Sequence, residues 1–340
     1  MTEITPTAAD ALRAATALPL IVGPMFLVSN AALVTAACQE GVIGSFPARS
    51  KWTAAEFETF LKEVTTTLDA YKTANPGKTV APYSINLSVR KNSARLQADL
   101  DLCEKYKVPI VHASGPVSAE IVNRIKSYGG ILLQDALTVE EARHAVAAGV
   151  DGIIAVAAGA GGQAGMINPI VLVNEIRQFH GGLLILAGSL STGRDIAAAQ
   201  ALGADMVLMG TRFLATQESA AEPDYKKMVV DSGSADIIYT SAISGIAGSF
   251  LKASIVANGY DPEDLKKRGP GADKIPTPPG QEGRAWKYVW SAGQAAGNIA
   301  DLPTVAELTD RLKAEYLAAK VDLARKFGTA PPAAPKPPQP

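Results

Sequence analysis

Three glycine-containing segments carry residue types that suit an active site. Residues 159–165 have the sequence Gly-Ala-Gly-Gly-Gln-Ala-Gly, in which Gln163 is the one polar side chain, and they follow the apolar run 152–157. Segments 188–193 and 210–212 follow apolar runs in the same way. Glycine lets the backbone approach a ligand closely, and loops at the carboxyl ends of parallel strands hold the chemistry of α/β proteins. We therefore expect these loops to form a site.

The second and third segments have the composition of a phosphate site. In barrels, the loops after the last two strands present backbone N–H groups and a positive helix N-terminus, which suit a phosphate monoester. Tight turns alone would also explain the glycines, but their occurrence on adjacent strands favours binding. A phosphate-bearing cofactor such as FMN, or a sugar phosphate, would contact the small residues and the cation of these loops, namely Ser189, Ser191, Gly193, Gly210, Thr211 and Arg212.

Polar side chains also end three earlier apolar runs. Asn86 and Ser88 end the third run, His112 the fourth, and Gln134 and Asp135 the fifth. Such groups can hydrogen-bond a cofactor ring or a substrate, although a packed structural role also explains His112. The three histidines are far apart in sequence and no Cys-x-x-Cys occurs, so no metal site is predicted.

The elements around these residues alternate regularly. Continuously apolar runs, typical of parallel strands covered by helices, are separated by amphipathic patterns with capping residues and terminal glycines. We predict a (β/α)8 TIM barrel. The eight strands are expected at 18–25, 42–46, 81–87, 109–112, 130–134, 152–156, 183–187 and 206–209, with helices at 29–40, 53–68, 93–105, 118–127, 138–148, 169–179 and 193–202.

The alternation stops near residue 221, which predicts four regions. Residues 1–220 form the barrel, and residues 221–300 form a smaller, mainly helical substrate or lid domain inserted after strand eight. Residues 301–328 are a helix that packs back on the barrel. Residues 329–340 are rich in proline, which predicts a disordered, extended tail.

Composition excludes several classes of protein. The 340 residues are 47% hydrophobic and 19% charged, with a formal net charge of -1, so neither nucleic acid nor an anionic membrane surface is an expected partner. No signal peptide pattern and no 18-residue apolar run is present, which favours a cytoplasmic protein. The two cysteines, Cys38 and Cys103, are expected to be reduced and partly buried.

Together these segments make the chain similar to a known family. It resembles the nitronate monooxygenase (2-nitropropane dioxygenase-like) family of FMN-dependent TIM-barrel oxidoreductases, from about residue 18 to 325. The resemblance rests on the order and spacing of Gly23-Pro-Met25, Asn86, Ala158-Gly-Ala-Gly-Gly-Gln-Ala-Gly165, Ala187-Gly-Ser189, Met209-Gly-Thr-Arg-Phe213, Ser244-Gly-Ile246 and Trp290-Ser-Ala-Gly-Gln294.

The resemblance implies a cofactor site and a substrate site. The FMN-binding residues would be Gly23, Pro24, Met25, Asn86, Gln134, Ala158, Gly159, Gly162, Gly188, Ser189, Gly210 and Thr211. The substrate, a small molecule, would meet His112, Gln163, Tyr239, Ser244 and Trp290.

One departure from the family affects the expected reaction. The family's glycine loop usually carries a histidine, proposed as the base that deprotonates a nitroalkane, where this chain has Gln163. An amide is not a base near pH 7. Oxidation of an already ionised alkyl nitronate with O2 needs no base. Neither does reduction of a quinone, enoyl or enone substrate by NAD(P)H, so both activities are expected alternatives. The sequence leaves the oligomeric state open, and a homodimer is one of the alternatives.

Overall fold

The computed structural model describes residues 7–90, 93–276 and 284–328 and contains a parallel eight-stranded sheet. The strand order is β1-β9-β8-β6-β5-β4-β3-β2, and a parallel bridge between Ile21 and Ile43 joins the two ends of the sheet into a barrel. The predicted TIM barrel is confirmed. Its strands are β1 (Leu20–Val22), β2 (Ser45–Pro47), β3 (Ser84–Ser88), β4 (Ile110–Ser114), β5 (Ile131–Ala136), β6 (Gly152–Val156), β8 (Leu183–Ala187) and β9 (Met206–Met209).

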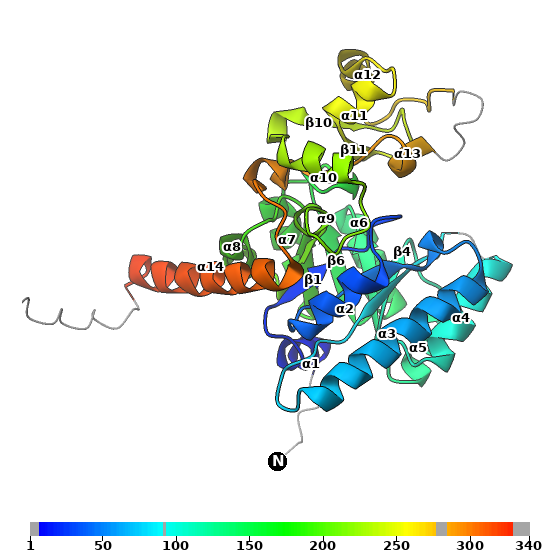
Figure 1. Cartoon of the computed structure of the whole chain (residues 1–340), viewed down its shortest axis with the longest axis vertical. Helices are drawn as coiled ribbons and strands as arrows, with labels where there is room; N and C mark the ends of the chain where they lie inside the picture. Colours follow the sequence, from blue (N-terminus) through cyan, green and yellow to red (C-terminus); the bar gives the residue numbers. More distant parts are fainter. Residues whose placement is uncertain (1–6, 91–92, 277–283, 329–340) are drawn as a thin grey trace, which may run out of the picture.

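Helices cover the outside of this barrel, as Figure 1 shows. Most begin at a Ser, Thr or Asn whose side chain accepts a hydrogen bond from the first turn, which satisfies a backbone donor that the helix itself leaves free. The barrel helices are α2 (Ala31–Gln39), α3 (Ala54–Ala74), α4 (Ala94–Lys105), α5 (Ala119–Ser127), α6 (Val139–Ala148), α7 (Pro169–Arg177) and α8 (Gly193–Leu202).

An additional helix, α1 (Ala8–Ala14), lies at the lower end of the barrel in Figure 1. Its buried Leu12 belongs to the cluster inside the barrel, together with Ile21, Ile110 and Leu133. The lower interior is therefore filled with apolar side chains, as expected for a packed barrel core. In barrels of this kind the ligand site lies at the opposite end, where the strands have their carboxyl ends.

Residues 221–276 and 284–300 lie at that opposite end, above the barrel in Figure 1. They include the helices α10 (Pro223–Val230), α11 (Lys252–Ala257), α12 (Pro262–Arg268) and α13 (Arg284–Lys287). They also contain two strands that the sequence analysis did not expect, β10 (Ile237–Thr240) and β11 (Gly248–Leu251). These two strands form an antiparallel sheet with β7 (Gly162–Gln163), which comes from the glycine loop of the barrel.

The last helix, α14 (Val305–Lys326), begins at a capping box between Thr304 and Glu307 and packs along α8, side by side with it in Figure 1. Its buried side chains Val305, Leu308 and Leu312 join the outer barrel core. Within the described residues, no helix is both long and apolar enough to span a bilayer. The predicted disordered tail, 329–340, lies outside those residues.

Candidate functional site

The glycine loop after β6 is bonded on several sides to chain segments from far along the sequence. Gly162 N donates to Ser291 Oγ at 2.7 Å, and Gln294 N donates to Gly159 O at 2.9 Å. Tyr239 Oη donates to Ala164 O at 2.5 Å. Burial raises the pKa of the Tyr239 phenol, so it remains a donor near neutral pH. The loop is thus held in place by the region above the barrel.

Glycines are required where this loop meets the segment 289–294. A Cβ placed on Gly293 would lie 2.5 Å from Gly159 O and 2.9 Å from Gly161 N, both rigid backbone atoms. Gly159 has φ +82°, in the left-handed region that side chains disfavour. The two backbones therefore approach more closely than any other residue type would allow.

Gln163 lies at the end of this loop, half-buried, in the strand β7 that pairs with Gly248 of β11. Its backbone position is fixed by that pairing. Among the described residues, its side-chain amide forms no hydrogen bond, so both the donor and the acceptor of the amide are available to a ligand.

The predicted phosphate loops remain a prediction, and their backbone has an unusual geometry. Gly188 and Ser189 are consecutive residues with positive φ, +109° and +60°. A positive φ at a non-glycine residue such as Ser189 is strained, and strain of this kind is typical of functional positions. Gly210 begins the short helix α9 (Thr211–Leu214) without a side-chain cap. Thr211 Oγ1, by contrast, accepts a hydrogen bond from Gly293 N at 2.9 Å.

The structure contradicts the expectation for three other residues of these loops. The N-terminus of α8 is already occupied, because Ser191 N donates to Asp195 Oδ2 at 2.8 Å and Gly193 N donates to Glu315 Oε2 at 2.7 Å. These two carboxylates neutralise the positive helix end where a phosphate would bind. Arg212 is buried and turned away, with an ion pair to Asp301 at 3.2 Å.

Residues Gly23, Pro24 and Met25 follow β1 beside the end of β9. Gly23 N donates to Met209 O at 2.9 Å, and a Cβ on Gly23 would lie 3.2 Å from Gly210 Cα. A Cβ on Gly210 would meet only Met25 side-chain atoms, at 3.8 Å. The Met25 side chain therefore lies next to Gly210, where the ends of β1 and β9 meet.

A network of polar side chains lies on the inner face of β3, β4 and β5. Asn86 Nδ2 donates to Ser114 Oγ at 2.8 Å, and Ser114 Oγ donates to Asp135 Oδ2 at 2.7 Å. His112 Nε2 lies 2.5 Å from Asp135 Oδ1. His112 is paired in register with Leu133, which belongs to the interior cluster, so these residues face the inside of the barrel.

Gln134 does not share this face. It is paired with Ala113, which packs in the cluster between the strands and the outer helices. Its Oε1 accepts a hydrogen bond from Val117 N at 3.2 Å, and its side chain is buried there. Side chains of a strand alternate between its two faces, so Asp135, and not Gln134, points into the barrel. We therefore replace Gln134 by Asp135 in the candidate site.

The residues expected from the upper region occupy different environments. Tyr239 reaches the glycine loop, as described above. Trp290 stacks on Tyr225 with ring centroids 4.8 Å apart, and its role in the structure is packing within the upper region. Ser244 is in the turn between β10 and β11, where its Oγ donates to Ile246 O at 2.5 Å. Among the described residues, the hydrogen bonds of the Ser244 side chain stay within that turn.

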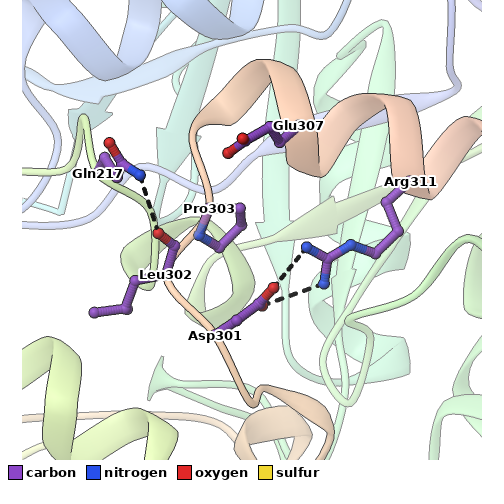
Figure 2. Close-up of a pocket in the computed structure, with 6 residues that line it drawn as sticks. All are labelled: Gln217, Asp301, Leu302, Pro303, Glu307 and Arg311. Atoms are coloured by element: carbon purple, nitrogen blue, oxygen red, sulfur yellow. Dashed lines mark hydrogen bonds and ion pairs between the residues drawn. The ribbon is translucent and has the colours of Figure 1, made fainter.

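One cavity lies elsewhere, at the start of α14 (Figure 2). Its volume is about 410 Å³, and Asp301 and Arg311 form an ion pair in its wall at 2.6 Å. It contains none of the predicted site residues, and its charged groups already satisfy each other. We exclude it as the active site.

The residues at the strand ends are compatible with FMN. Gly188, Ser189 and Gly210 are small residues whose backbone a phosphate could approach, while Met25 and Asn86 provide an apolar and a polar side chain for a flavin ring. The described residues contain no group of three or more His, Cys, Asp or Glu that could hold a metal. Both cysteines are buried, and burial raises the pKa of the Cys38 thiol to about 12, so neither is a reactive nucleophile.

Sequence reasoning missed the partners that fix this site. Ser114, Ser291 and Gly293 had no assigned role, although Ser291 and Gly293 lie in a motif segment that was recognised. Side chains alternate between the two faces of a strand, and this alternation would have separated Asp135 from Gln134. The preceding residues 131–133 are all apolar, however, so the sequence shows no alternation from which the faces could be assigned. The pairing of His112 with Asp135 depends on strand register, which the sequence does not specify.

Comparison with known proteins identifies the family. The model of the family described as "Nitronate monooxygenase" matches residues 11–315. A nitronate monooxygenase of Paraburkholderia phytofirmans is 28% identical over 359 residues, covering 91% of this chain and 94% of that protein. A probable nitronate monooxygenase of Staphylococcus haemolyticus is 31% identical over 225 residues, covering 61% of this chain and 62% of the relative.

A solved structure supports the fold. The nitroalkane oxidase of Streptomyces ansochromogenes superimposes with a TM-score of 0.75 at 24% identity, covering 92% of this chain and 99% of that one. The family match spans almost the whole barrel and the upper region together. The chain therefore belongs to the nitronate monooxygenase family and is a flavin-dependent oxidoreductase.

Proposed function

We propose that this protein binds FMN and oxidises alkyl nitronates with O2. The observation that carries the proposal is the family match over residues 11–315, combined with a non-basic residue at position 163. An alkyl nitronate is already ionised, so its oxidation requires no proton abstraction by that residue. The Gln163 amide can donate a hydrogen bond to a nitronate oxygen, which would orient the substrate.

In this proposal the two halves of the strand ends hold different parts of the cofactor. Gly188, Ser189, Gly210 and Thr211 would hold the phosphate, while residues 23–25 and the Asn86 amide would contact the ring. Ala158, Gly159 and Gly162 would form the adjacent wall. Bound FMN would supply the electron acceptor, and the protein would supply binding and orientation. Residues 221–300 would cover the site as a substrate domain, attached to it through Tyr239 and β11.

An oxygen-uptake assay tests this function. Purified protein reconstituted with FMN is mixed with preformed nitronates of nitroethane, 1-nitropropane and 2-nitropropane. We expect a flavin absorbance spectrum, bleaching of that spectrum under anaerobic conditions, and oxygen uptake that saturates with nitronate concentration. Holoenzyme that shows neither bleaching nor oxygen uptake with any of these nitronates would exclude the proposed function.

The neutral residue at position 163 also favours a second candidate, the reduction of a quinone, enoyl or enone substrate by NAD(P)H. Hydride transfer needs no base at that position. Anaerobic mixing of the holoenzyme with NADH and with NADPH separates the two candidates, because a reductase requires rapid flavin bleaching by one of them. Flavin that remains oxidised with both nucleotides rules this candidate out.

A further inference from the structure

His112 stands out from the other two histidines because it lies inside the barrel. It is 4% exposed, and its neighbours across the sheet are Asn86 on β3 and Leu133 on β5. His144 is exposed on α6, whereas the His180 ring lies against Leu183 O at the other end of β8. Of the three histidines, His112 is thus the one whose ring contacts a member of the polar network of the strand ends.

Asp135 fixes the orientation of the His112 ring. Its Oδ1 contacts His112 Nε2 at 2.5 Å, while its Oδ2 accepts a hydrogen bond from Ser114 Oγ at 2.7 Å. An ionised carboxylate can only accept hydrogen bonds, so Nε2 carries a proton when it faces this group. In the neutral ring the other nitrogen, Nδ1, then has the free lone pair. A carboxylate that holds the opposite nitrogen is the arrangement that makes an imidazole an oriented proton acceptor.

His112 Nδ1 is buried and, among the described residues, has no hydrogen-bond partner. Buried polar atoms are normally paired, and exceptions require an explanation such as a catalytic role or a bound molecule. Two more unpaired atoms, Ser45 Oγ and Ser84 Oγ, lie on the neighbouring strands β2 and β3, where Ser45 and Ser84 are register partners. The inner faces of β2 to β4 therefore contain polar groups that lack partners in the protein alone.

We propose that the His112–Asp135 pair is the proton acceptor of this enzyme, which allows it to use neutral nitroalkanes in addition to nitronates. The C–H bond next to the nitro group breaks, and its proton forms an N–H bond at Nδ1. The electron pair of the broken bond stays on the substrate, which becomes the nitronate. This inference rests on the proposed function, because that nitronate is the species then oxidised.

The surroundings of His112 fit this role. Asp135 is the charged group that contacts the ring, and it stabilises the imidazolium that forms when Nδ1 gains a proton. The other groups of the network, Asn86 and Ser114, are neutral, as is Ser84 on β3. Deprotonation of the substrate by His112 requires the neutral ring, in which Nδ1 keeps its lone pair.

A substitution that keeps the contact with Asp135 but removes the lone pair tests the proposal. The side-chain amide of His112→Gln can still donate to the carboxylate but cannot accept a proton. The rates (kcat/KM) with neutral nitroethane and with preformed ethyl nitronate are compared by oxygen uptake. We expect the rate with nitroethane to fall by about 100-fold, as is typical for loss of a general base, and the rate with the nitronate to fall much less. His144→Gln is the matched control on the surface.

The outcome is judged by the ratio of the two rates. A ratio that drops by about tenfold or more relative to the parent enzyme supports His112, and a smaller change overturns the inference while leaving nitronate oxidation intact. Parent enzyme that oxidises the nitronate but not nitroethane overturns it as well. Failure with both substrates, in contrast, is a failure of the proposed function itself.

Nuclear magnetic resonance provides a readout that is independent of turnover. The chain has three histidines, so ¹⁵N-histidine-labelled holoenzyme gives a simple spectrum, which His112→Gln and His144→Gln assign. We expect His112 to carry its proton on Nε2 and to leave Nδ1 unprotonated at the pH of activity. Asp135→Asn should change this tautomer. A His112 ring that carries its proton on Nδ1 at the pH of activity would overturn the inference.

Discussion

The candidate site at the carboxyl ends of the strands has two halves, which differ in the chemical groups that form them. From β6 to β9 the site consists of backbone, with glycines at 159, 188, 210 and 293 and hydrogen bonds that join the barrel to the segment 289–294. From β3 to β5 it consists of side chains, of which His112 and Asp135 can carry charge. Backbone donors bind an anion without proton transfer, whereas a paired imidazole can exchange a proton. We infer that binding and proton chemistry are divided between the halves.

The backbone half should tolerate added atoms least. In Gly293→Ala the backbone conformation suits alanine, with φ -87°, but the new Cβ would overlap with Gly159 O and Gly161 N. Overpacking of this kind costs about 1–3 kcal/mol of folding free energy. Because the displaced loop lies beside the flavin site, we also expect FMN affinity to fall on the order of tenfold or more. Thermal unfolding and FMN titration measure the two effects.

Gly162→Ala is the matched comparison for that variant. Gly162 has φ +69°, but a Cβ there would meet no atom within 4 Å. Only the backbone strain remains, about 1 kcal/mol. If Gly162→Ala lost as much flavin affinity as Gly293→Ala, the close approach of the two backbones would not be what maintains the site.

A double substitution tests whether the two halves share one proton-transfer role. In the His112→Gln background, Gln163→His places a basic side chain in the glycine loop after β6, where the family resemblance puts one. We expect it to recover on the order of tenfold of the lost nitroethane activity, and to add much less to the parent, which already has a base. Oxygen uptake with nitroethane for the four proteins measures the coupling. Equal gains in both backgrounds would mean that His112 and residue 163 act independently.

The difference between the halves also explains what the sequence could predict. The barrel and its glycine loops follow from local patterns, namely apolar runs, caps and glycines, so all eight strands were located. Strands β10 and β11 pair mainly with each other, and they were missed because each has only four residues. The pairing of β11 with the two-residue strand β7, which is distant in sequence, leaves no local pattern.

Side-chain partners were predicted less well than backbone elements. Gln134 was chosen over its neighbour because both end an apolar run, and a one-residue difference reverses the face of a strand. Gly193 was expected at a phosphate because the sequence does not show that α14 brings Glu315 to the same helix end. Both errors arose because the sequence does not show which side chains meet in the folded protein.

The smallest predicted effects compare a hydroxyl that has a partner with one that has none. Thr211→Val removes the acceptor of the buried Gly293 N–H, which should lower the free energy of unfolding by about 1–3 kcal/mol. Ser84→Ala removes a buried hydroxyl that has no hydrogen-bond partner in the part of the chain that the structure describes, so the change should be near zero or stabilising. Urea unfolding of the two variants measures the difference. A loss for Ser84→Ala as large as that for Thr211→Val would show that the Ser84 hydroxyl binds a buried water molecule, and that the side-chain half of the site is hydrated even where its walls are closed to solvent.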